Sequence, residues 1–288
     1  MTEIAGKAAL VTGGGSGIGM ALAKALAKEG ASVALADIRL DNAREVADEI
    51  VAEGGRAVAI QCDVCERGDI ARMKAEANAA VGRIELLFSN AGASSFVPVV
   101  EMDDREIEWM IQVNLMAGIW ITKAFLADMI EARSGHIIVS SSMAGLTPAH
   151  IPIHAPYCAA KMGLIGYVMN LQREIDEFNI KTTIYCSGGV VGGMRLHNNS
   201  YRPEKFGGPT DAKMKIPKAS FEKNPIKFYW PEGVAPMVLT AVRNDRPFVF
   251  DHSEQREDFR KTYSDIVEAC FDDTLRYEQE VGIPPSVN

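Results

Sequence analysis

Short, continuous apolar runs recur along the first 250 residues and constrain the fold more than any other feature of the chain. Continuous runs, rather than alternating ones, are typical of parallel strands that are covered on both faces. The segments between them place apolar residues three or four apart, as Leu164, Val168, Leu171 and Ile175 do, which is the pattern of one helix face. Strand and helix alternate repeatedly, so the sequence predicts an α/β fold: a doubly wound parallel sheet of about seven strands with helices on both faces. The predicted strands cover residues 8–11, 33–36, 57–60, 86–88, 137–139, 183–185 and 248–250.

The composition excludes several classes of partner. With 38 acidic and 30 basic residues the chain has a net charge of -8, which disfavours nucleic acid and anionic membrane surfaces. No apolar run approaches the roughly 20 residues that cross a bilayer, and the first residues do not form a signal peptide, so we expect a cytoplasmic protein with no membrane partner. The 5 cysteines do not suggest a disulfide framework, and no cluster of acids and histidines suggests a metal site.

A glycine-rich segment follows the first predicted strand and leads into the first predicted helix. Gly13, Gly17 and Gly19 permit a tight turn that brings backbone N–H groups close to a pyrophosphate, and the helix N-terminus adds positive potential. The second predicted strand ends in Asp37, whose carboxylate can bind the adenosine ribose hydroxyls and would repel a 2′-phosphate. Arg39 nearby could offset that repulsion, and Asp37 could instead be a solvated turn residue. The pattern nevertheless favours a dinucleotide cofactor, and NAD over NADP.

Tyr157 and Lys161 lie four residues apart at the start of a predicted helix, which places them on one helix face. The strand before this helix ends in Ser140, Ser141 and Ser142. A phenol that acts as a base near neutral pH needs its pKa lowered by about 3 units from about 10. A nearby ammonium group, with a positive nicotinamide ring, can lower it. The sequence therefore predicts that Tyr157 is an acid/base catalyst and that Lys161 activates it.

Over roughly residues 4–250 the chain resembles the short-chain dehydrogenase/reductase family. Beside the glycine loop and the Tyr-x-x-x-Lys pair, the motifs Asp63-Val64, Asn90-Ala91-Gly92, Asn114 and a serine after the fifth strand occur in the family's order. The resemblance implies an NAD-dependent enzyme that acts on a CH–OH group of a small-molecule substrate. It also implies a homo-oligomer, either a dimer or a tetramer.

The resemblance assigns a role to each matching residue. Tyr157 would be the acid/base, Ser142 would donate a hydrogen bond to the substrate oxygen, and Lys161 would also bind the nicotinamide ribose. Asn114 would anchor a water molecule in a proton relay. The residues implied in cofactor binding are Gly13, Ser16, Gly17, Ile18, Gly19, Asp37, Ile38, Asp63, Val64, Asn90, Ala91, Gly92, Tyr157, Lys161, Gly188 and Val190.

The chain departs from the family pattern near two of these residues. Ser142 lies slightly farther before the tyrosine than the family places its serine, so Ser140 and Ser141 remain alternatives. The Pro-Gly expected after the sixth strand reads Ser187-Gly188, and a glycine stands where a threonine is expected shortly afterwards. We therefore expect nicotinamide binding to rely on backbone groups of Val190.

Charge is distributed unevenly along the chain. Residues 1–250 carry 28 acidic and 26 basic residues and are predicted to form one Rossmann-type NAD-binding and catalytic domain. Within it, the long stretch 192–230, rich in glycine and proline and basic over most of its length, is predicted to be a substrate lid. Residues 251–288 carry 10 acidic and 4 basic residues, and we expect an acidic helical extension. This extension would pack over the lid of its own or a neighbouring subunit, or lie solvated on the surface.

Three segments without acidic or basic residues, 86–100, 134–160 and 182–194, are expected to wall the substrate site, since hydride transfer works best where water is excluded. The long lid suggests a bulky substrate. The chain also loosely resembles bacterial dehydrogenases of lignin-derived aryl ethers, which implies an aromatic secondary alcohol and its ketone. A 3-hydroxyacyl-CoA or a hydroxysteroid is the alternative, and a catalytically idle dinucleotide-binding protein is the alternative of another class. The candidate wall residues are Ser94, Ser95, Phe96, Met143, His150, His154 and Met194.

Overall fold

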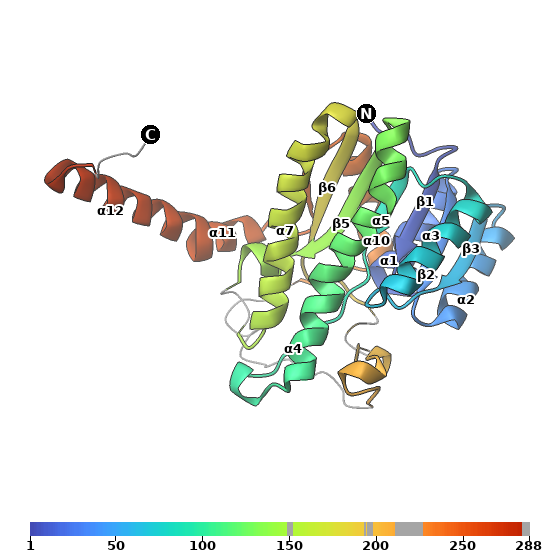
Figure 1. Cartoon of the computed structure of the whole chain (residues 1–288), viewed down its shortest axis with the longest axis horizontal. Helices are drawn as coiled ribbons and strands as arrows, with labels where there is room; N and C mark the ends of the chain where they lie inside the picture. Colours follow the sequence, from blue (N-terminus) through green and yellow to red (C-terminus); the bar gives the residue numbers. More distant parts are fainter. Residues whose placement is uncertain (149–151, 193, 195–197, 211–226, 284–288) are drawn as a thin grey trace.

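The computed structural model describes residues 1–148, 152–192, 194, 198–210 and 227–283. Its centre is a 7-stranded sheet in the order β3-β2-β1-β4-β5-β6-β7, and every neighbouring pair of strands is parallel. Strands β2 and β3 follow one another on one side of β1, and β4 to β7 follow one another on the other side. This is the strand order of a doubly wound fold, so the predicted fold class is confirmed (Figure 1). The strands are β1 (Ala8–Thr12), β2 (Ser32–Asp37), β3 (Arg56–Gln61), β4 (Leu86–Ser89), β5 (Gly135–Ser142), β6 (Ile180–Ser187) and β7 (Phe248–Phe250).

Helices cover both faces of the sheet. Helices α1, α2 and α10 bury their apolar faces in one core cluster, and α3, α5 and α7 bury theirs in the other. The α-helices are α1 (Gly17–Lys28), α2 (Leu40–Ala52), α3 (Arg67–Val81), α4 (Asp104–Ile111), α5 (Ala117–Ala132), α6 (Met143–Leu146), α7 (Ala155–Ile175), α10 (Pro231–Arg243), α11 (Gln255–Phe259) and α12 (Asp265–Val281). Short 3-10 turns are η1 (Val99–Glu101), η3 (Asp176–Phe178), η4 (Asn198–Tyr201) and η5 (Glu204–Phe206), and π-helical turns are η2 (Gln112–Met116) and η6 (Arg260–Ser264).

The strands have continuous apolar centres because side chains from both of their faces enter the two cores. In β1, Leu10 belongs to the cluster with α3, α5 and α7, whereas Ala9 and Val11 belong to the cluster with α1, α2 and α10. All five residues of β1 are buried. A strand that is covered on both faces has no position that favours a polar side chain, which is why continuous runs predicted these strands.

Helices α4 and α5 join through η2 into one long helix, Asp104–Ala132. By length and composition this helix is apolar enough to cross a membrane, which the sequence prediction did not foresee. Its buried face packs inside the molecule, however, and 44% of the apolar window is buried there. Gly118 lets α5 approach α7, since a Cβ atom at this position would lie 2.8 Å from Leu164 Cδ1. One face of this helix therefore packs in the core of the described structure.

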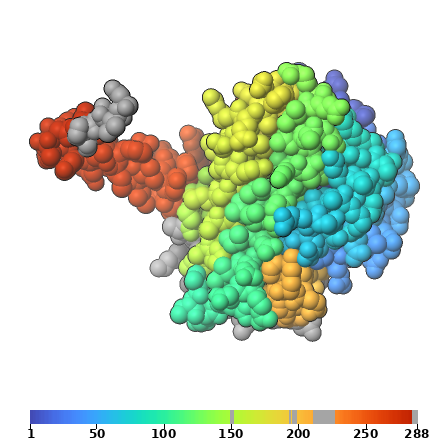
Figure 2. All heavy atoms as spheres, in the orientation of Figure 1, coloured from blue at the N-terminus to red at the C-terminus, as the bar shows by residue number. Residues whose placement is uncertain are grey.

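The C-terminal segment α11–η6–α12 leaves the body after β7 and projects away from it as an arm (Figures 1 and 2). The predicted helical extension is confirmed, but α12 has no buried residue, and Phe271 on it is 66% exposed. Residues 198–210 of the lid lie at the opposite side of the body from α12 (Figure 1). The predicted packing over the lid of its own subunit is therefore not formed between α12 and these residues, but His252 at the start of the extension does contact the lid, since its Nε2 lies 2.9 Å from the Lys227 carbonyl oxygen.

Candidate active site

A cavity of about 890 Å³ opens at the carboxyl edge of the sheet. It extends over the loops that follow β1 to β6 and the first turns of α7, which is where open α/β sheets bind ligands. Of the site residues predicted from the sequence, all except Gly19 and Asn114 line it. Of the candidate wall residues, Ser94, Phe96, Met143, His154 and Met194 line it, Ser95 does not, and His150 lies outside the described residues.

The glycine loop needs its glycines for close backbone approach. Gly13 has φ +66°, and a Cβ atom there would lie 3.1 Å from Ala91 Cα. A Cβ atom at Gly19 would lie 2.0 Å from the carbonyl oxygen of Gly13, so α1 can start against the loop only with glycine at this position. The Ser16 side chain does not cap α1. The N-terminus of α1 is consequently suited to bind an anion such as a pyrophosphate.

Asp37 ends β2 with its carboxylate among backbone donors. Its Oδ2 accepts a hydrogen bond from Gly15 N at 3.0 Å, and its Oδ1 accepts one from Arg39 N at 3.0 Å. The residue is only 8% exposed, which argues against a solvated turn residue. Burial raises the pKa of the Asp37 carboxyl, and the N–H donors oppose that shift. Asp63 after β3 has a similar setting, since its Oδ1 accepts from Cys65 N at 2.9 Å.

Asn90 links three strands beneath the cavity. Its backbone N donates to Thr12 Oγ1 at 3.0 Å, and its Nδ2 donates to the Thr12 carbonyl oxygen at 3.1 Å. Its Oδ1 accepts a hydrogen bond from Ser140 Oγ at 3.0 Å. Asn90 thus holds the ends of β1, β4 and β5 together at the place where the glycine loop turns.

Ser142 is the only one of the three consecutive serines whose hydroxyl affects the pKa of Tyr157, which it lowers. Its Oγ also donates to the carbonyl oxygen of Ser187 at 3.2 Å. The hydroxyl of Ser141 donates to the Lys161 carbonyl oxygen at 2.9 Å, and that of Ser140 is bound to Asn90. The geometry therefore favours Ser142 over the two alternatives that the sequence left open.

Tyr157 and Lys161 lie one turn apart on α7, which begins with Pro156 in its first turn. Lys161 Nζ lies 5.5 Å from the centroid of the Tyr157 ring and donates to the Ser140 carbonyl oxygen at 2.8 Å. Burial raises the pKa of Tyr157 to about 12, although the bond from Ser142 opposes the shift, and burial lowers the pKa of Lys161 to about 8. Burial thus shifts the pKa of Tyr157 in the direction opposite to the one that the sequence predicted from a nearby ammonium and a positive nicotinamide ring.

Asn114 lies in the π-helical turn η2 and is buried behind the cavity wall. Its Nδ2 donates to the carbonyl oxygens of Ala93 at 2.9 Å and Met110 at 3.0 Å. A Cβ atom at Gly92 would lie 2.8 Å from Asn114 Oδ1 and 3.5 Å from Lys161 Nζ. Gly92 thus leaves space where the amide of Asn114 and the ammonium of Lys161 converge. A π-turn frequently marks a functional position in a helix.

His154 forms an uncharged aromatic wall beside Tyr157. Its ring lies 4.3 Å from the Tyr157 ring and meets the Phe96 ring edge-on at 4.1 Å, as measured between centroids. Its Nε2 lies 3.2 Å from Ser94 Oγ. Burial lowers the pKa of His154 to about 4, so the imidazole is neutral at neutral pH.

The described part of the lid is fastened to the body by ion pairs that the sequence did not predict. Arg202 pairs with Glu106 at 3.3 Å, and its guanidinium carbon lies 4.9 Å from the centroid of the Trp109 ring. Lys205 pairs with Glu66 at 2.6 Å. These lid cations are thus matched by carboxylates of the body rather than by those of the C-terminal extension.

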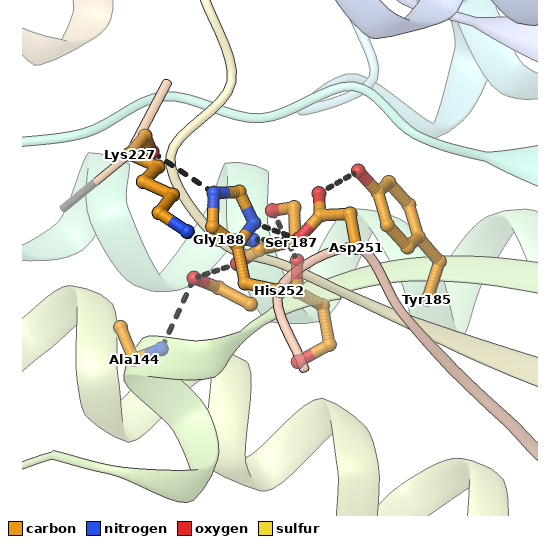
Figure 3. A network of polar contacts seen from close by, with 9 residues as sticks. Ala144, Tyr185, Ser187, Gly188, Lys227, Asp251 and His252 are labelled. Atoms are coloured by element: carbon orange, nitrogen blue, oxygen red, sulfur yellow. Dashed lines mark hydrogen bonds and ion pairs between the residues drawn. The ribbon is translucent and has the colours of Figure 1, made fainter. Parts of the chain in front are cut away.

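A buried polar network beside Gly188 was also missed by sequence reasoning (Figure 3). Asp251 directly follows β7, and its carboxylate accepts hydrogen bonds from Tyr185 Oη at 2.6 Å and Gly188 N at 2.8 Å. His252 Nδ1 lies 2.5 Å from Asp251 Oδ1, and its Nε2 lies 2.9 Å from the Lys227 carbonyl oxygen. Adjacent aspartate and histidine after the last predicted strand are the only sequence signal for it.

This network fixes the loop after β6 to the returning end of the lid. A Cβ atom at Gly188 would lie 2.5 Å from His252 Nδ1, so the ring fits only against glycine. The His252 ring also packs on Tyr229, with centroids 4.4 Å apart. Tyr229 N donates to the Gly189 carbonyl oxygen at 2.9 Å, and Val191 N donates to the Tyr229 carbonyl oxygen at 2.9 Å. The predicted nicotinamide loop is thereby held on two sides.

Comparison with known proteins links these features to one family. The family model described as short chain dehydrogenase matches residues 7–202. A short chain dehydrogenase of Pseudocercospora fijiensis is 36% identical over 190 residues, which cover 65% of this chain but only 61% of the relative. A C alpha-dehydrogenase of Sphingobium sp. strain SYK-6 is 27% identical over 271 residues, which cover 93% of this chain and 88% of that protein.

Solved structures share the architecture. A short chain dehydrogenase/reductase from Burkholderia phymatum, in complex with NAD, has a TM-score of 0.85 at 23% identity, with 100% of both chains covered. The apo form of LigO from Sphingobium sp. strain SYK-6 has a TM-score of 0.76 at 25% identity, with 99% of this chain and 100% of that chain covered. At 23% identity the first likeness shows the fold alone.

Proposed function

The chain belongs to the short-chain dehydrogenase family, and on that premise we propose that it is an NAD-dependent oxidoreductase that transfers a hydride between NAD and a bulky, aromatic secondary alcohol or its ketone. One observation carries the proposal: Ser142, Tyr157 and Lys161 converge in a single cavity with the glycine loop. An idle dinucleotide-binding protein would have no chemical need for that convergence.

The residues present fit NAD. The loop at Gly13 and Gly19 has no space for side chains, and the start of α1 offers N–H groups to a pyrophosphate. Asp37 lines the same cavity, where its carboxylate suits the ribose hydroxyls and disfavours a 2′-phosphate. Gly188 and Val190 would hold the nicotinamide end with Lys161. The NAD complex of the Burkholderia phymatum protein, which has the same fold, supports this choice of cofactor.

When bound, NAD accepts or returns the hydride and, in its oxidised form, brings a positive charge to the site. Tyr157 Oη takes the proton from the carbinol oxygen during alcohol oxidation and returns it during ketone reduction. Ser142 Oγ donates a hydrogen bond to the same substrate oxygen. The Lys161 ammonium, 5.5 Å from the centroid of the Tyr157 ring, would favour the phenolate against the effect of burial and pass the proton on toward the buried Asn114.

The walls of the cavity support an aromatic substrate. Phe96, Trp109, His154 and Phe228 all line it, and its volume is near the upper end of the 300–1,000 Å³ that is typical of ligand pockets. Such rings favour contact with another aromatic group through stacked or edge-on packing. The similarity to a C alpha-dehydrogenase, together with the resemblance to dehydrogenases of aryl ethers, agrees with this class of substrate.

A 3-hydroxyacyl-CoA or a hydroxysteroid is the second candidate. The basic lid is the feature that favours an anionic thioester, but Arg202 and Lys205 of the described lid already pair with body carboxylates. A panel of aryl, steroid and hydroxyacyl-CoA secondary alcohols with NAD, followed by the absorbance of NADH, tests the proposal. Fastest oxidation of the aryl alcohols is expected, a preference for hydroxyacyl-CoA would overturn the substrate class, and no turnover of any alcohol would overturn the enzyme.

The domain organisation is part of the proposal. Residues 1–250 would form the catalytic domain with its lid at 192–230, and residues 251–288 the extension. Because Asp251 and His252 are buried in the body and Gln255 lines the cavity, we place the separable part of the extension after α11. We also propose that the protein is a cytoplasmic homodimer or homotetramer, as the family resemblance implies.

A further inference from the structure

The described lid crosses the adenosine end of the cavity as well as its substrate end. Tyr201, in η4, lines the cavity together with Asp37 and Ile38. Its hydroxyl accepts a hydrogen bond from Asn42 Nδ2 at 3.2 Å, and the guanidinium carbon of Arg39 lies 5.6 Å from the centroid of its ring. Tyr201 of the lid thus contacts Asn42, in the first turn of α2, and Arg39, in the turn between β2 and α2.

Arg39 is positioned to decide between NAD and NADP. Its backbone N donates to the Asp37 carboxylate, and its charge lowers the pKa of that carboxyl. A 2′-phosphate at this ribose position needs a cation, and guanidinium groups bind phosphate well because they offer several N–H donors in one plane. The guanidinium of Arg39 lies over the face of Tyr201 instead.

The lid is held in this position by contacts on both sides of Tyr201. Lys205 Nζ pairs with Glu66 at 2.6 Å and donates to the Cys65 carbonyl oxygen at 3.0 Å, close in the chain to Asp63, one of the predicted cofactor-binding residues. Arg202 is paired with Glu106 at a mostly buried position on the substrate side. The Tyr201 ring is therefore set over Arg39 by the course of the lid and not by the stacking contact alone.

We propose that Tyr201 belongs to the adenosine subsite and makes the enzyme more selective for NAD, because it holds the Arg39 guanidinium away from a 2′-phosphate. The inference rests on the proposed function, since it requires that the cavity binds NAD. Discrimination then has two parts: Asp37 repels the phosphate, and Tyr201 withholds the cation that would bind it.

The test is direct binding by calorimetry, without turnover. The dissociation constants of NAD and NADP are measured for Asp37→Ser, in which NADP binding becomes measurable, and for the same variant with Tyr201→Ala or Tyr201→Phe added. We expect Tyr201→Ala to lower the ratio of the NADP to the NAD dissociation constant about two- to fivefold, the size of an exposed cation–π contact. Tyr201→Phe is the matched control, since it keeps the ring face over Arg39, and it should leave the ratio unchanged.

A third substitution identifies the cation. Adding Arg39→Ala to the Asp37→Ser, Tyr201→Ala variant should remove the gain in NADP binding, and thermal melting checks that each variant is folded. An unchanged ratio for Tyr201→Ala, or an equal drop for Tyr201→Phe, would overturn the role of Tyr201 while leaving the proposed function intact. Failure of the unmodified protein to bind NAD at all would overturn both.

Discussion

At the end of the cavity that follows β1, β2 and β3, carboxylates accept hydrogen bonds from backbone N–H groups, as Asp37 does from Gly15 and Arg39. At the end formed by β5 and α7, the direction is reversed. Ser142 and Lys161 donate to backbone carbonyl oxygens, and both ionisable side chains of the Tyr157–Lys161 pair are buried. At the same edge of the sheet, the backbone therefore offers N–H donors to side chains at one end of the cavity and carbonyl acceptors at the other.

This difference separates binding from chemistry. Backbone N–H donors stabilise an anion and keep a carboxylate charged, which suits a group that must hold a sugar in place. Burial raises the pKa of Tyr157 to about 12 and lowers that of Lys161 to about 8, so it disfavours the charged form of both side chains. Strongly shifted pKa values of this kind are found preferentially where a protein carries out chemistry.

Tyr157→Phe should separate the two ends most sharply. It removes the group that moves the proton, so we expect kcat to fall on the order of 10²–10⁴-fold. The dissociation constant of NAD should change little, because Asp37 and the glycine loop are untouched. Steady-state formation of NADH and calorimetric titration with NAD measure the two effects. A kcat close to that of the unmodified enzyme would contradict the role of Tyr157.

Lys161→Met should abolish turnover and yet stabilise the fold at neutral pH. The pKa of Lys161 is lowered from 10.5 to about 8 in the folded protein, so below pH 8 the fold carries a buried ammonium that the unfolded chain holds in water. Its replacement should raise the free energy of unfolding by about 1–3 kcal/mol at pH 7.

The stability difference between Lys161→Met and the unmodified protein should depend on pH. As pH rises above about 8, folded Lys161 loses its proton before the unfolded chain does, so the unmodified protein gains stability between pH 8 and 10.5. The advantage of the variant should therefore shrink over that range in urea unfolding curves. An advantage that stays constant with pH would show that it does not come from the buried charge.

Gly188→Ala should destabilise the loop after β6, at the predicted nicotinamide end of the cavity, and leave the end that follows β1 to β3 unaffected. The added Cβ would lie 2.5 Å from His252 Nδ1, and overpacking of this kind costs about 1–3 kcal/mol of unfolding free energy. Gly166→Ala is the matched control, because a Cβ atom there meets nothing within 4 Å and the helix α7 should gain up to about 1 kcal/mol. Urea unfolding measures both, and equal effects of the two variants would contradict the packing of His252 on Gly188.

Truncation after Ser264 should have the smallest effect on either end. It removes α12, which has no buried residue, so we expect the free energy of unfolding to change by no more than about 0.5 kcal/mol and kcat to stay the same. Light scattering on the same sample measures the assembly. An assembly with fewer subunits would show that α12 joins subunits, as expected if the acidic extension packs over the lid of a neighbouring subunit.

The parts of the molecule that sequence predicted are those encoded locally. The strand runs and the glycine loop each depend on a few consecutive residues, and the Tyr157–Lys161 pair needs only one helical turn. The Asp251–Tyr185 bond could not be predicted in this way, because it requires that residues 66 positions apart meet through the pairing of β6 and β7. The contact of Tyr201 with Arg39 likewise depends on the path of the lid.

The pKa of Tyr157 shows a second limit of sequence reasoning. The pattern correctly placed a cation nearby, but the sign of the shift depends on how completely the hydroxyl is withdrawn from water, and only the packed structure gives that. The choice of serine is a third case, because the spacing left Ser140, Ser141 and Ser142 open. Alternation along β5 turns Ser141 to the other face, and the hydrogen bond of Ser140 to Asn90, which only the folded structure shows, leaves Ser142.

The way the chain leaves β7 sets how the gene tolerates early stop codons. A stop directly after Phe250 deletes Asp251 and His252, and with them the only described side-chain acceptor for the N–H of Gly188. A stop after Ser264, only fourteen codons later, keeps every described residue that lines the cavity. Between these two points the same kind of lesion changes from one that removes residues anchoring the loop after β6 and lining the cavity to one that removes only α12 and the residues after it.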